Sequence, residues 1–392
     1  MGLSSATLDK VKPSPTIAMT QAARDLAASG RDVLSLTAGE PDFPTPPDVA
    51  EAAIEAIRAG KTRYTAVDGI LELKEAVAAK WRADYGLTIT PEQVSVSGGG
   101  KQVLFNALMA TLDPGDEVII PAPYWVSYPD MTVLCGGTPV VVPTRMEDGF
   151  RLQAADLAAA ITARTKWLIL NSPGNPTGAV LSRAELEAIA EVLRAHPHVH
   201  VICDDIYEAI TFGVPFLTLT QVAPDLAERV LVVNGVSKGH AMTGWRIGYG
   251  VGPAPLIAMM RKVQSQSTSN PCSIAQWAAV AALTGPQDHL ERQRAAYEAR
   301  RGLVMEGLRA CKGIVCADPD GAFYAFANIE ACLGTRFATD EDFAMALLEE
   351  QGVGTVFGSA FGAPGHLRIS FATSEEVLRE ALARLQAFCA AL

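Results

Sequence analysis

The sequence predicts an α/β protein with two domains. Seven short apolar segments rich in β-branched residues recur between residues 93 and 251, and patterns of helical period separate several of them. Continuous apolar strands separated by helices indicate a mainly parallel seven-stranded sheet covered by helices on both faces. The chain has 392 residues, which exceeds what one hydrophobic core usually supports. We therefore expect a large domain at residues 46–285 and a smaller α+β domain formed by residues 1–45 and 286–392.

The elements of the large domain follow from local patterns. The first 35 or so residues are polar with short apolar patches, and residues 32–36 are typical of a strand that ends in a Gly/Pro loop. Residues 47–60 and 70–85 have helical periodicity, and the loop between them carries Tyr64. The seven strands are predicted at 93–97, 117–121, 138–142, 166–171, 199–203, 229–233 and 246–251, with helices at 101–112, 154–161 and 183–195.

The C-terminal part of the chain has a different pattern. A helix at 273–283 and a long charged helix at 287–308 lead into it. Strands are predicted at 322–328, 354–357 and 366–371, and helices at 340–351 and 374–387. This order favours an α+β unit, and we expect the N-terminal segment to pack with it.

Composition narrows the class of protein. Hydrophobic residues make up 49% of the chain and charged residues 19%, with no apolar run of membrane-spanning length and no apolar signal core near the N-terminus. The net charge of −11 argues against nucleic acid or anionic membranes as partners. The seven cysteines are scattered without a Cys-x-x-Cys pair, which favours free thiols in a reducing compartment. We expect a cytoplasmic protein.

One lysine and one arginine suggest covalent amine chemistry. In the stretch VLVVNGVSKGHAMTGWRIGYG (230–250), Lys238 follows an apolar strand and Arg246 comes eight residues later. Desolvation and nearby cations favour the neutral, nucleophilic form of a lysine, and arginine offers a fork for a phosphate. Together they suggest a Schiff-base lysine beside a phosphate anchor, as pyridoxal phosphate (PLP) requires. Alone the spacing is weak, because most lysines after strands only solvate a loop.

Three further groups follow predicted strands, where ligands of open parallel sheets bind. Gly98–Gly100 open a helix and could cradle a phosphate, although Ser95 and the residue after Lys101 depart from a Walker A loop. Asn175 lies in a Pro-rich turn, and Asp204 follows a buried strand and needs a cationic partner, such as a protonated pyridine. A lone Gly-rich turn such as the first has poor specificity for phosphate. The local alternatives are a structural turn for the Asn175 segment and a helix cap or salt bridge for Asp204.

The motifs together carry a resemblance. In this order along the chain, NSPGNPTG (171–178), CDDIYE (203–208), VSKGHAMTGWRIGYG (236–250) and GHLRISFA (365–372) resemble the fold-type I PLP-dependent aminotransferases of class I. TAGEPDFPTP, SGGGKQVLFNA and PAPYWVSYPDM are similar to the bacterial Ib branch of aspartate aminotransferases. The resemblance covers almost the whole chain and implies the fold-type I architecture.

The resemblance implies roles for cofactor binding. Lys238 would bind PLP covalently and act as general base and acid, while Asp204 would keep the pyridine nitrogen protonated. Tyr207 and Asn175 would hydrogen-bond the 3-oxygen of the ring, and Trp125 would stack on its face. The phosphate would be held by Gly99, Gly100, Lys101 and Arg246. Tyr64 would reach the phosphate of a neighbouring subunit, which implies a homodimer with shared active sites.

The resemblance also implies a substrate site. Arg368 would bind the α-carboxylate, assisted by the Gly39 backbone and Asn175, with Trp125 alongside. Lys101 would take the distal carboxylate, since no match exists for the second arginine of the Ia branch. The segment VKPSPT, with its Lys12, resembles the corresponding segment of the enzymes that also transaminate prephenate. The resemblance thus implies that Lys12 serves prephenate.

These roles lead to an expected function and leave alternatives open. We expect ping-pong transamination between L-aspartate and 2-oxoglutarate, with conversion of prephenate to arogenate as a second hypothesis. A class I relative of aromatic, alanine or kynurenine specificity, or a C–S lyase, would share nearly every cofactor contact. A PLP-binding transcription regulator is disfavoured by the negative charge and the lack of a basic N-terminal module.

A few other residues invite functional interpretations. His196, His198 and His200 alternate, but no acidic or thiol ligand is near them in sequence, so we expect no metal. His240 lies near Lys238, yet the lysine already serves as the base, so a place behind the site or on the surface is expected. Residues 323 and 324 either line the pocket or form a core strand.

Overall fold

The computed structural model describes residues 3–392 and contains the predicted seven-stranded sheet. Its strand order is β2-β8-β7-β6-β5-β3-β4. β3 to β7 are mutually parallel, whereas β8 is antiparallel to both neighbours. The mainly parallel sheet is thus confirmed, with strands β2 (Val94–Ser97), β3 (Glu117–Ala122), β4 (Thr138–Pro143), β5 (Thr165–Asn171), β6 (His200–Asp204), β7 (Val230–Gly235) and β8 (Gly248–Val251).

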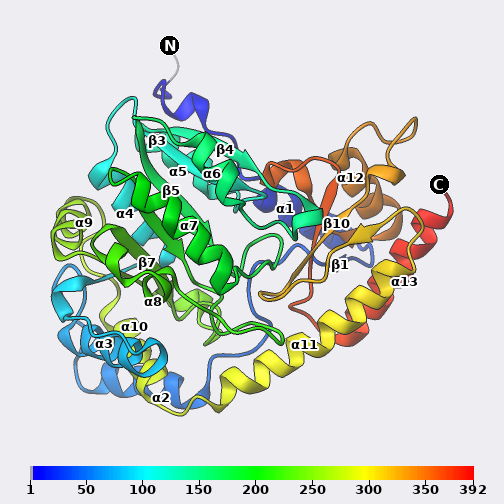
Figure 1. The fold of residues 1–392 in the computed structure, drawn as a ribbon. Coiled ribbons are helices and arrows are strands. Elements are labelled where there is room, and N and C mark those ends of the chain that lie inside the picture. Colours follow the sequence, from blue (N-terminus) through cyan, green and yellow to red (C-terminus); the bar gives the residue numbers. More distant parts are fainter. Residues whose placement is uncertain (1–2) are drawn as a thin grey trace.

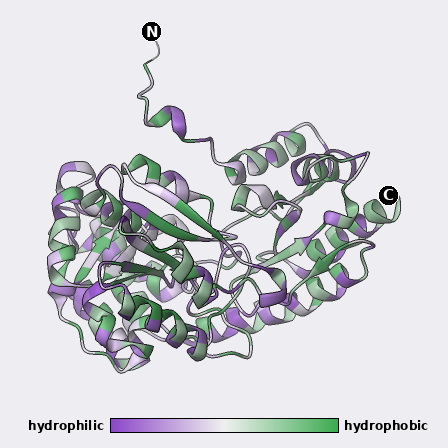
Figure 2. Cartoon of the chain, turned by 45° about the horizontal axis from the view of Figure 1, so that its top comes forward, coloured by the Kyte–Doolittle hydropathy of each residue, from purple (hydrophilic) through white to green (hydrophobic). Residues whose placement is uncertain are grey.

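Helices cover both faces of this sheet (Figure 1). Along β6, Val201 and Cys203 pack into one core while Ile202 packs into the other, as alternating side chains of a strand require. The first core includes side chains from α2 (Pro47–Arg58), α3 (Leu71–Tyr85), α7 (Arg183–Ala195) and α10 (Ser273–Thr284). The second includes side chains from α4 (Gly100–Thr111), α5 (Ser127–Leu134) and α9 (Ala254–Ser267). Figure 2 shows the strands of this sheet as largely hydrophobic, whereas the surrounding helices carry both hydrophobic and hydrophilic residues. We call this sheet with its helices the large unit.

A second, smaller unit has its own sheet and core. Its antiparallel strand order is β12-β13-β10-β9, with β9 (Val315–Cys316), β10 (Tyr324–Asn328), β12 (Val356–Phe357) and β13 (His366–Ser370). β1 (Leu34–Ser35) pairs with β11 (Val353–Gly354), so the N-terminal segment joins this unit. Its helices are α1 (Pro15–Ala28), α12 (Asp340–Gln351), α13 (Glu375–Ala390) and part of α11 (Asp288–Arg309). The division into domains at residues 46 and 286 stays a prediction.

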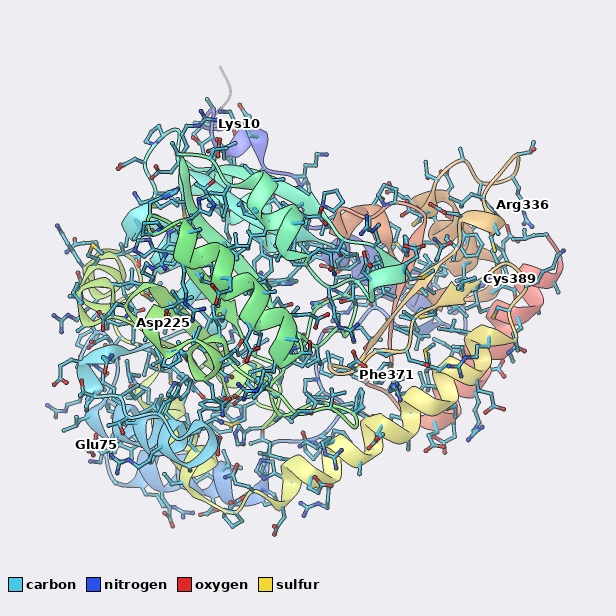
Figure 3. All side chains as sticks on the ribbon, in the orientation of Figure 1. Lys10, Glu75, Asp225, Arg336, Phe371 and Cys389 are labelled. Atoms are coloured by element: carbon cyan, nitrogen blue, oxygen red, sulfur yellow. The ribbon has the colours of Figure 1, made fainter. Side chains whose placement is uncertain are left out.

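The two units are connected by α11, which runs from one to the other (Figure 1). They also meet through aromatic rings. The centroids of Phe212, from the large unit, and Phe371, from the small unit, are 6.3 Å apart. Figure 3 places Phe371 between the units and Arg336 and Cys389 at the far end of the small one. Ligands between the units can therefore contact side chains of both.

The structure differs from the sequence expectations in a few segments. No helix was expected at residues 15–28, yet α1 forms there; only Met19 and Ala23 are buried along it, so its apolar stripe is too thin to stand out. The strand expected at 246–251 begins at Gly248, because Arg246 has the left-handed backbone conformation (φ 56°) after a 3-10 turn. The expected strand at 32–36 is shortened to the two residues of β1.

Two properties of the described residues concern the environment of the protein. Within residues 3–392, no helix is long and apolar enough to cross a membrane. Each of the seven cysteines is a free thiol.

Candidate active site

A cavity of about 840 Å³ opens at the carboxyl ends of the central strands, between the two units. Ten residues singled out from the sequence line it: Gly39, Gly100, Lys101, Trp125, Asn175, Asp204, Tyr207, Lys238, Arg246 and Arg368. Their elements are far apart in sequence, and they converge because parallel strands place their carboxyl ends at one edge of the sheet. The structure thus brings these ten residues together around one cavity, and their roles in binding and catalysis stay predictions.

Asp204 is the last residue of β6 and is only 6% exposed. Its Oδ2 accepts a hydrogen bond from the Tyr128 hydroxyl at 2.7 Å, and its backbone carbonyl accepts one from Asn171 Nδ2 at 2.7 Å. Burial raises the pKa of the carboxyl to about 6, against the lowering effect of Tyr128. Such a carboxylate is stabilised by a cationic partner, and a protonated ring nitrogen would be one.

Lys238 lies just beyond β7 and points its amine into the cavity. Its Nζ donates a hydrogen bond to the carbonyl of Gly39 and lies 5.9 Å from the ring centroid of Tyr207. Burial is the main cause that lowers its pKa to about 8, and the positive charges of Arg368 and Arg246 add to it. A substantial neutral fraction near physiological pH makes this amine a competent nucleophile and base.

The start of α4 forms a cradle for an anion. Gly99 has φ 100°, and a Cβ atom there would collide with the guanidinium of Arg246. Likewise, a Cβ on Gly248 would collide with the backbone of Gly99 and Gly100, so β8 packs directly against the turn. Arg246 donates to the carbonyls of Thr243 and Gly98 at 3.0 and 3.2 Å, which leaves N–H groups free for a ligand. A glycine turn, a helix N-terminus and an arginine fit a phosphate group.

Lys101 and Trp125 lie together at the side of this cradle. The Nζ of Lys101 is 4.7 Å from the centroid of the Trp125 ring. Burial, and then the charge of Arg246, lowers the pKa of Lys101. The pair offers an aromatic face and a second cation near the phosphate cradle. With Asp204 and Lys238, these residues fit the phosphate, ring and aldehyde of PLP.

Arg368 is held as an oriented fork in β13. It is 2% exposed, its Nη1 donates to Asn175 Oδ1 at 3.1 Å, and its Nη2 donates to the carbonyl of Thr37 at 2.7 Å. Its guanidinium lies 4.6 Å from the centroid of the Tyr324 ring. Within residues 3–392, the Nε atom has no hydrogen-bond partner. A buried guanidinium with an unused N–H group is suited to a ligand carboxylate.

Some residues of the site were missed from the sequence or only half predicted. Tyr128 had no role assigned, because its contact with Asp204 spans 76 residues and no local pattern marks it. Of the residues at 323 and 324, Tyr324 lines the cavity and its hydroxyl lies 2.9 Å from that of Tyr207, whereas Phe323 is fully buried in the core. Tyr324 thus satisfies both alternatives, since it lines the cavity and also lies buried in β10, whereas Phe323 belongs to the core alone.

Other predicted residues lie outside the cavity. Tyr64 is 93% exposed, and Lys12 is exposed near Asp130, so one copy of the chain does not bring either into the lining. Gly99 contributes through its backbone turn without lining the cavity itself. The surface place considered for His240 is wrong, because the residue is buried with its Nδ1 2.9 Å from His289 Nε2. Within residues 3–392, no cluster of His, Cys, Asp or Glu is arranged to hold a metal ion.

The fold and this cavity are those of an aminotransferase. Residues 31–385 match the family model of aminotransferase class I and II, and the chain belongs to that family. It is 58% identical to the aspartate/prephenate aminotransferase of Cereibacter sphaeroides, with both chains fully covered. It is 54% identical to a probable aspartate/prephenate aminotransferase of Rhizobium leguminosarum bv. phaseoli, over 98% of each chain.

Solved structures give the same classification. The crystal structure of the aspartate aminotransferase from Rhizobium meliloti has a TM-score of 0.97 and 48% identity, covering 100% of this chain and 99% of that one. The aspartate aminotransferase from Thermus thermophilus with maleate has a TM-score of 0.93 and 46% identity, with both chains fully covered. The fold-type I architecture is therefore confirmed, and the chain is similar along its length to aspartate-type aminotransferases.

Proposed function

We propose that this protein is a PLP-dependent aspartate aminotransferase that exchanges amino groups between L-aspartate and 2-oxoglutarate and also accepts prephenate. The observation that carries this proposal is the convergence of Lys238, Asp204, Arg246 and Arg368 on one cavity. A nucleophilic amine, a buried carboxylate, a phosphate cradle and a carboxylate fork are the four groups that amino-acid chemistry on PLP requires. The names of the full-length relatives support the choice of substrates.

In this proposal the cofactor would be held by residues described above. Lys238 would attach it covalently, and Lys101, Arg246 and the backbone of Gly99 and Gly100 would hold its phosphate. Tyr207, Asn175 and Trp125 would surround its ring. When bound, PLP supplies an electrophilic carbon for an amine and a ring that withdraws electrons from the substrate Cα. The role of Asp204 is to keep the ring nitrogen cationic.

The protein residues then orient the substrate and move its proton. Arg368 and Asn175 would fix the α-carboxylate and so orient the Cα hydrogen. Once the substrate amine had replaced it on the cofactor, the freed Nζ of Lys238, whose pKa is lowered to about 8, would take that proton and later return one. Half-reactions that share one site, with the first product leaving before the second substrate binds, predict ping-pong kinetics.

Substrate choice depends on the cations at the cavity mouth. Lys101 lines the cavity and would bind the distal carboxylate of aspartate. Lys12 would approach prephenate only if the N-terminal segment moved toward the cavity. A second copy of the chain would bring its own Tyr64 to the phosphate cradle, so we also propose a homodimer, which sedimentation of the purified protein would test.

The decisive experiment compares substrates side by side. Aspartate, alanine, phenylalanine and kynurenine are offered as donors to 2-oxoglutarate, and prephenate is offered as acceptor from aspartate. We expect kcat/KM for aspartate to exceed that of the other donors by about 100-fold. If kcat/KM were highest for phenylalanine, alanine or kynurenine, the result would contradict the aspartate proposal. It would favour a class I aminotransferase specific for that donor.

A matched pair of variants tests the prephenate hypothesis. We expect Lys12→Ala to raise KM for prephenate about tenfold and to leave aspartate turnover nearly unchanged. Lys10→Ala is the control, because Lys10 is an equally exposed lysine of the same segment. Unchanged prephenate kinetics in Lys12→Ala would remove the basis of this second activity.

A further inference from the structure

Residues 317–322 leave the small unit and contact loops of the large unit beside the cavity; we call them the crossing. They connect β9 to β10. The amides of Asp320 and Gly321 both donate to the carbonyl of Gly178, at 3.0 and 2.8 Å. The amide of Phe212 donates to the carbonyl of Asp320 at 2.7 Å. The crossing is therefore hydrogen-bonded to two separate loops of the large unit.

Packing leaves the crossing no room to slide. A Cβ atom on Gly178 would lie 2.5 Å from Cβ of Pro319 and 2.6 Å from the carbonyl oxygen of Gly321. A Cβ atom on Gly321 would lie 2.6 Å from the carbonyl oxygen of Ile210. Backbones in such close approach leave no space for a side chain between the crossing and these loops.

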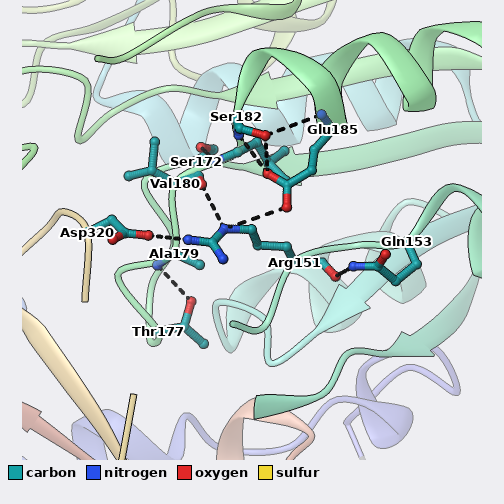
Figure 4. A network of polar contacts seen from close by, with 10 residues as sticks. Arg151, Gln153, Ser172, Thr177, Ala179, Val180, Ser182, Glu185 and Asp320 are labelled. Atoms are coloured by element: carbon teal, nitrogen blue, oxygen red, sulfur yellow. Dashed lines mark hydrogen bonds and ion pairs between the residues drawn. The ribbon is translucent and has the colours of Figure 1, made fainter. Parts of the chain in front are cut away.

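One side chain fastens this contact from outside. Arg151 donates from Nη2 to the carboxylate of Asp320 and from Nε to the carbonyl of Val180 at 3.0 Å. The Nε atom of Arg151 also lies 3.8 Å from Oε1 of Glu185. The other carboxylate oxygen of Glu185, Oε2, accepts a hydrogen bond from the amide of Ser182 at the start of α7. Figure 4 shows the guanidinium between the crossing and the large-unit loop. Both partners of the ion pair are partly buried, where charge-assisted bonds are stronger than on an open surface.

Both ends of this contact lead into the cavity. Asn175 lies three residues before Gly178 and accepts a hydrogen bond from Arg368. Tyr324 lies four residues after Asp320, and its ring packs under the same guanidinium. Tyr324 and Arg368 are already held together by the pairing of β10 with β13. The contact of the crossing with the Gly178 loop therefore bears on the position of Asn175, which comes from the large unit, relative to Arg368.

We propose that Arg151 is a positioning residue for the substrate carboxylate: by holding the crossing against the large unit, it sets Asn175 of that unit against Arg368 of the small unit. Arg151 itself does not line the cavity, so it would not contact a substrate bound there. The identity of the substrate rests on the proposed function above. The mechanical link, by which Arg151 holds the crossing against the large unit, does not depend on it.

The kinetic test uses variants with a matched control. Arg151→Met should raise KM for aspartate about tenfold and change kcat less than about twofold, because binding is weakened without loss of a reacting group. Arg151→Lys keeps the charge but lacks the second nitrogen with which Arg151 reaches Val180 as well as Asp320, so its KM should lie between those of the parent and Arg151→Met. Arg145→Met is the control, since Arg145 is 64% exposed and pairs with Asp148 in its own loop. It should leave KM unchanged.

A double-mutant cycle separates positioning from general weakening. In an Asn175→Ala background, the Arg151→Met change should add less than about twofold to KM, because the residue through which it acts is gone. Independent, multiplying effects would overturn the proposal. Equal KM changes in the Arg145 and Arg151 variants would also overturn it.

Amide hydrogen exchange gives a readout without turnover. The amides of Asp320 and Gly321 should exchange about tenfold faster in Arg151→Met than in the parent or in Arg145→Met, because local opening becomes easier. Unchanged exchange would overturn the mechanical link. A parent enzyme that fails to turn over aspartate would refute the proposed function, and exchange would still decide whether Arg151 fastens the crossing.

Discussion

The two edges of the central sheet hold buried charges in opposite ways. At the amino ends of β3 and β5, Glu117 is 5% exposed, and its carboxylate accepts from Thr162 Oγ1 at 2.5 Å and from Arg164 Nε at 3.0 Å. These donors, Thr162 first, lower the pKa of Glu117. At the carboxyl end of β6, Asp204 is just as buried, but its pKa is raised to about 6. The amino edge thus stabilises the carboxylate of Glu117, whereas the carboxyl edge disfavours the carboxylate of Asp204.

The lysines of the two edges show the same contrast. Lys166 Nζ lies 2.9 Å from the carboxylate of Asp116 at the amino edge. Lys238 at the carboxyl edge donates to a neutral carbonyl, and burial lowers its pKa to about 8. The amino edge satisfies its charges within the chain, which favours folding. The cavity edge leaves them poised for a ligand that brings the opposite charge and a reacting carbon.

The largest effect should come from removing the cavity amine. Lys238→Ala should lower kcat for aspartate about 10⁴-fold, because both the covalent attachment and the proton transfer are lost. Borohydride reduction of the parent with PLP should modify Lys238 alone, which peptide mass spectrometry can check. Lys166→Ala is the control from the other edge and should keep its activity. Labelling of another lysine would refute the assignment.

Asp204→Asn should lower kcat about 100-fold and yet stabilise the apoprotein at neutral pH. The folded-state pKa of about 6 lies above the ordinary 3.8, so burial favours the protonated form and its stabilising effect is lost as pH rises through 6. An asparagine has no charge to bury, so the gain at pH 7 should be on the order of 2–3 kcal/mol and should vanish near pH 4. Urea unfolding at both pH values measures it.

Asp116→Asn gives the opposite sign and serves as the control. Its hydrogen bonds to the Asp113 amide and to Lys166 lower the pKa of Asp116 although burial raises it. That stability is present above the ordinary carboxyl pKa and is lost as pH falls through the lowered value, so this variant should be less stable than the parent at pH 7. If both variants shifted stability in the same direction, the contrast between the edges would be wrong.

The sequence pointed to residues at the cavity edge more readily than to the residues that hold them in place. Apolar runs located all seven strands. Lys238 and Asp204 became candidates because they come after predicted strands, whose carboxyl ends topology brings together, and the resemblance supplied their expected roles. Tyr128 and Arg151 were missed, since each acts through a partner 76 or 169 residues away. Helix α1 was missed because it buries only a thin stripe. Contacts between distant segments follow from packing, which local patterns do not encode.

The smallest effect on catalysis should come from the amino edge itself. Glu117→Gln replaces a carboxylate that accepts from Thr162 and Arg164 with a neutral amide, so the charge-assisted part of these bonds is lost. We expect a loss of about 1–2 kcal/mol in the free energy of unfolding at pH 7, with kcat and KM for aspartate unchanged. Denaturant midpoints and steady-state kinetics on the same preparation measure both. A fall in kcat without a fall in stability would mean that this edge also serves the reaction, and the functional division of the sheet into two edges would have to be abandoned.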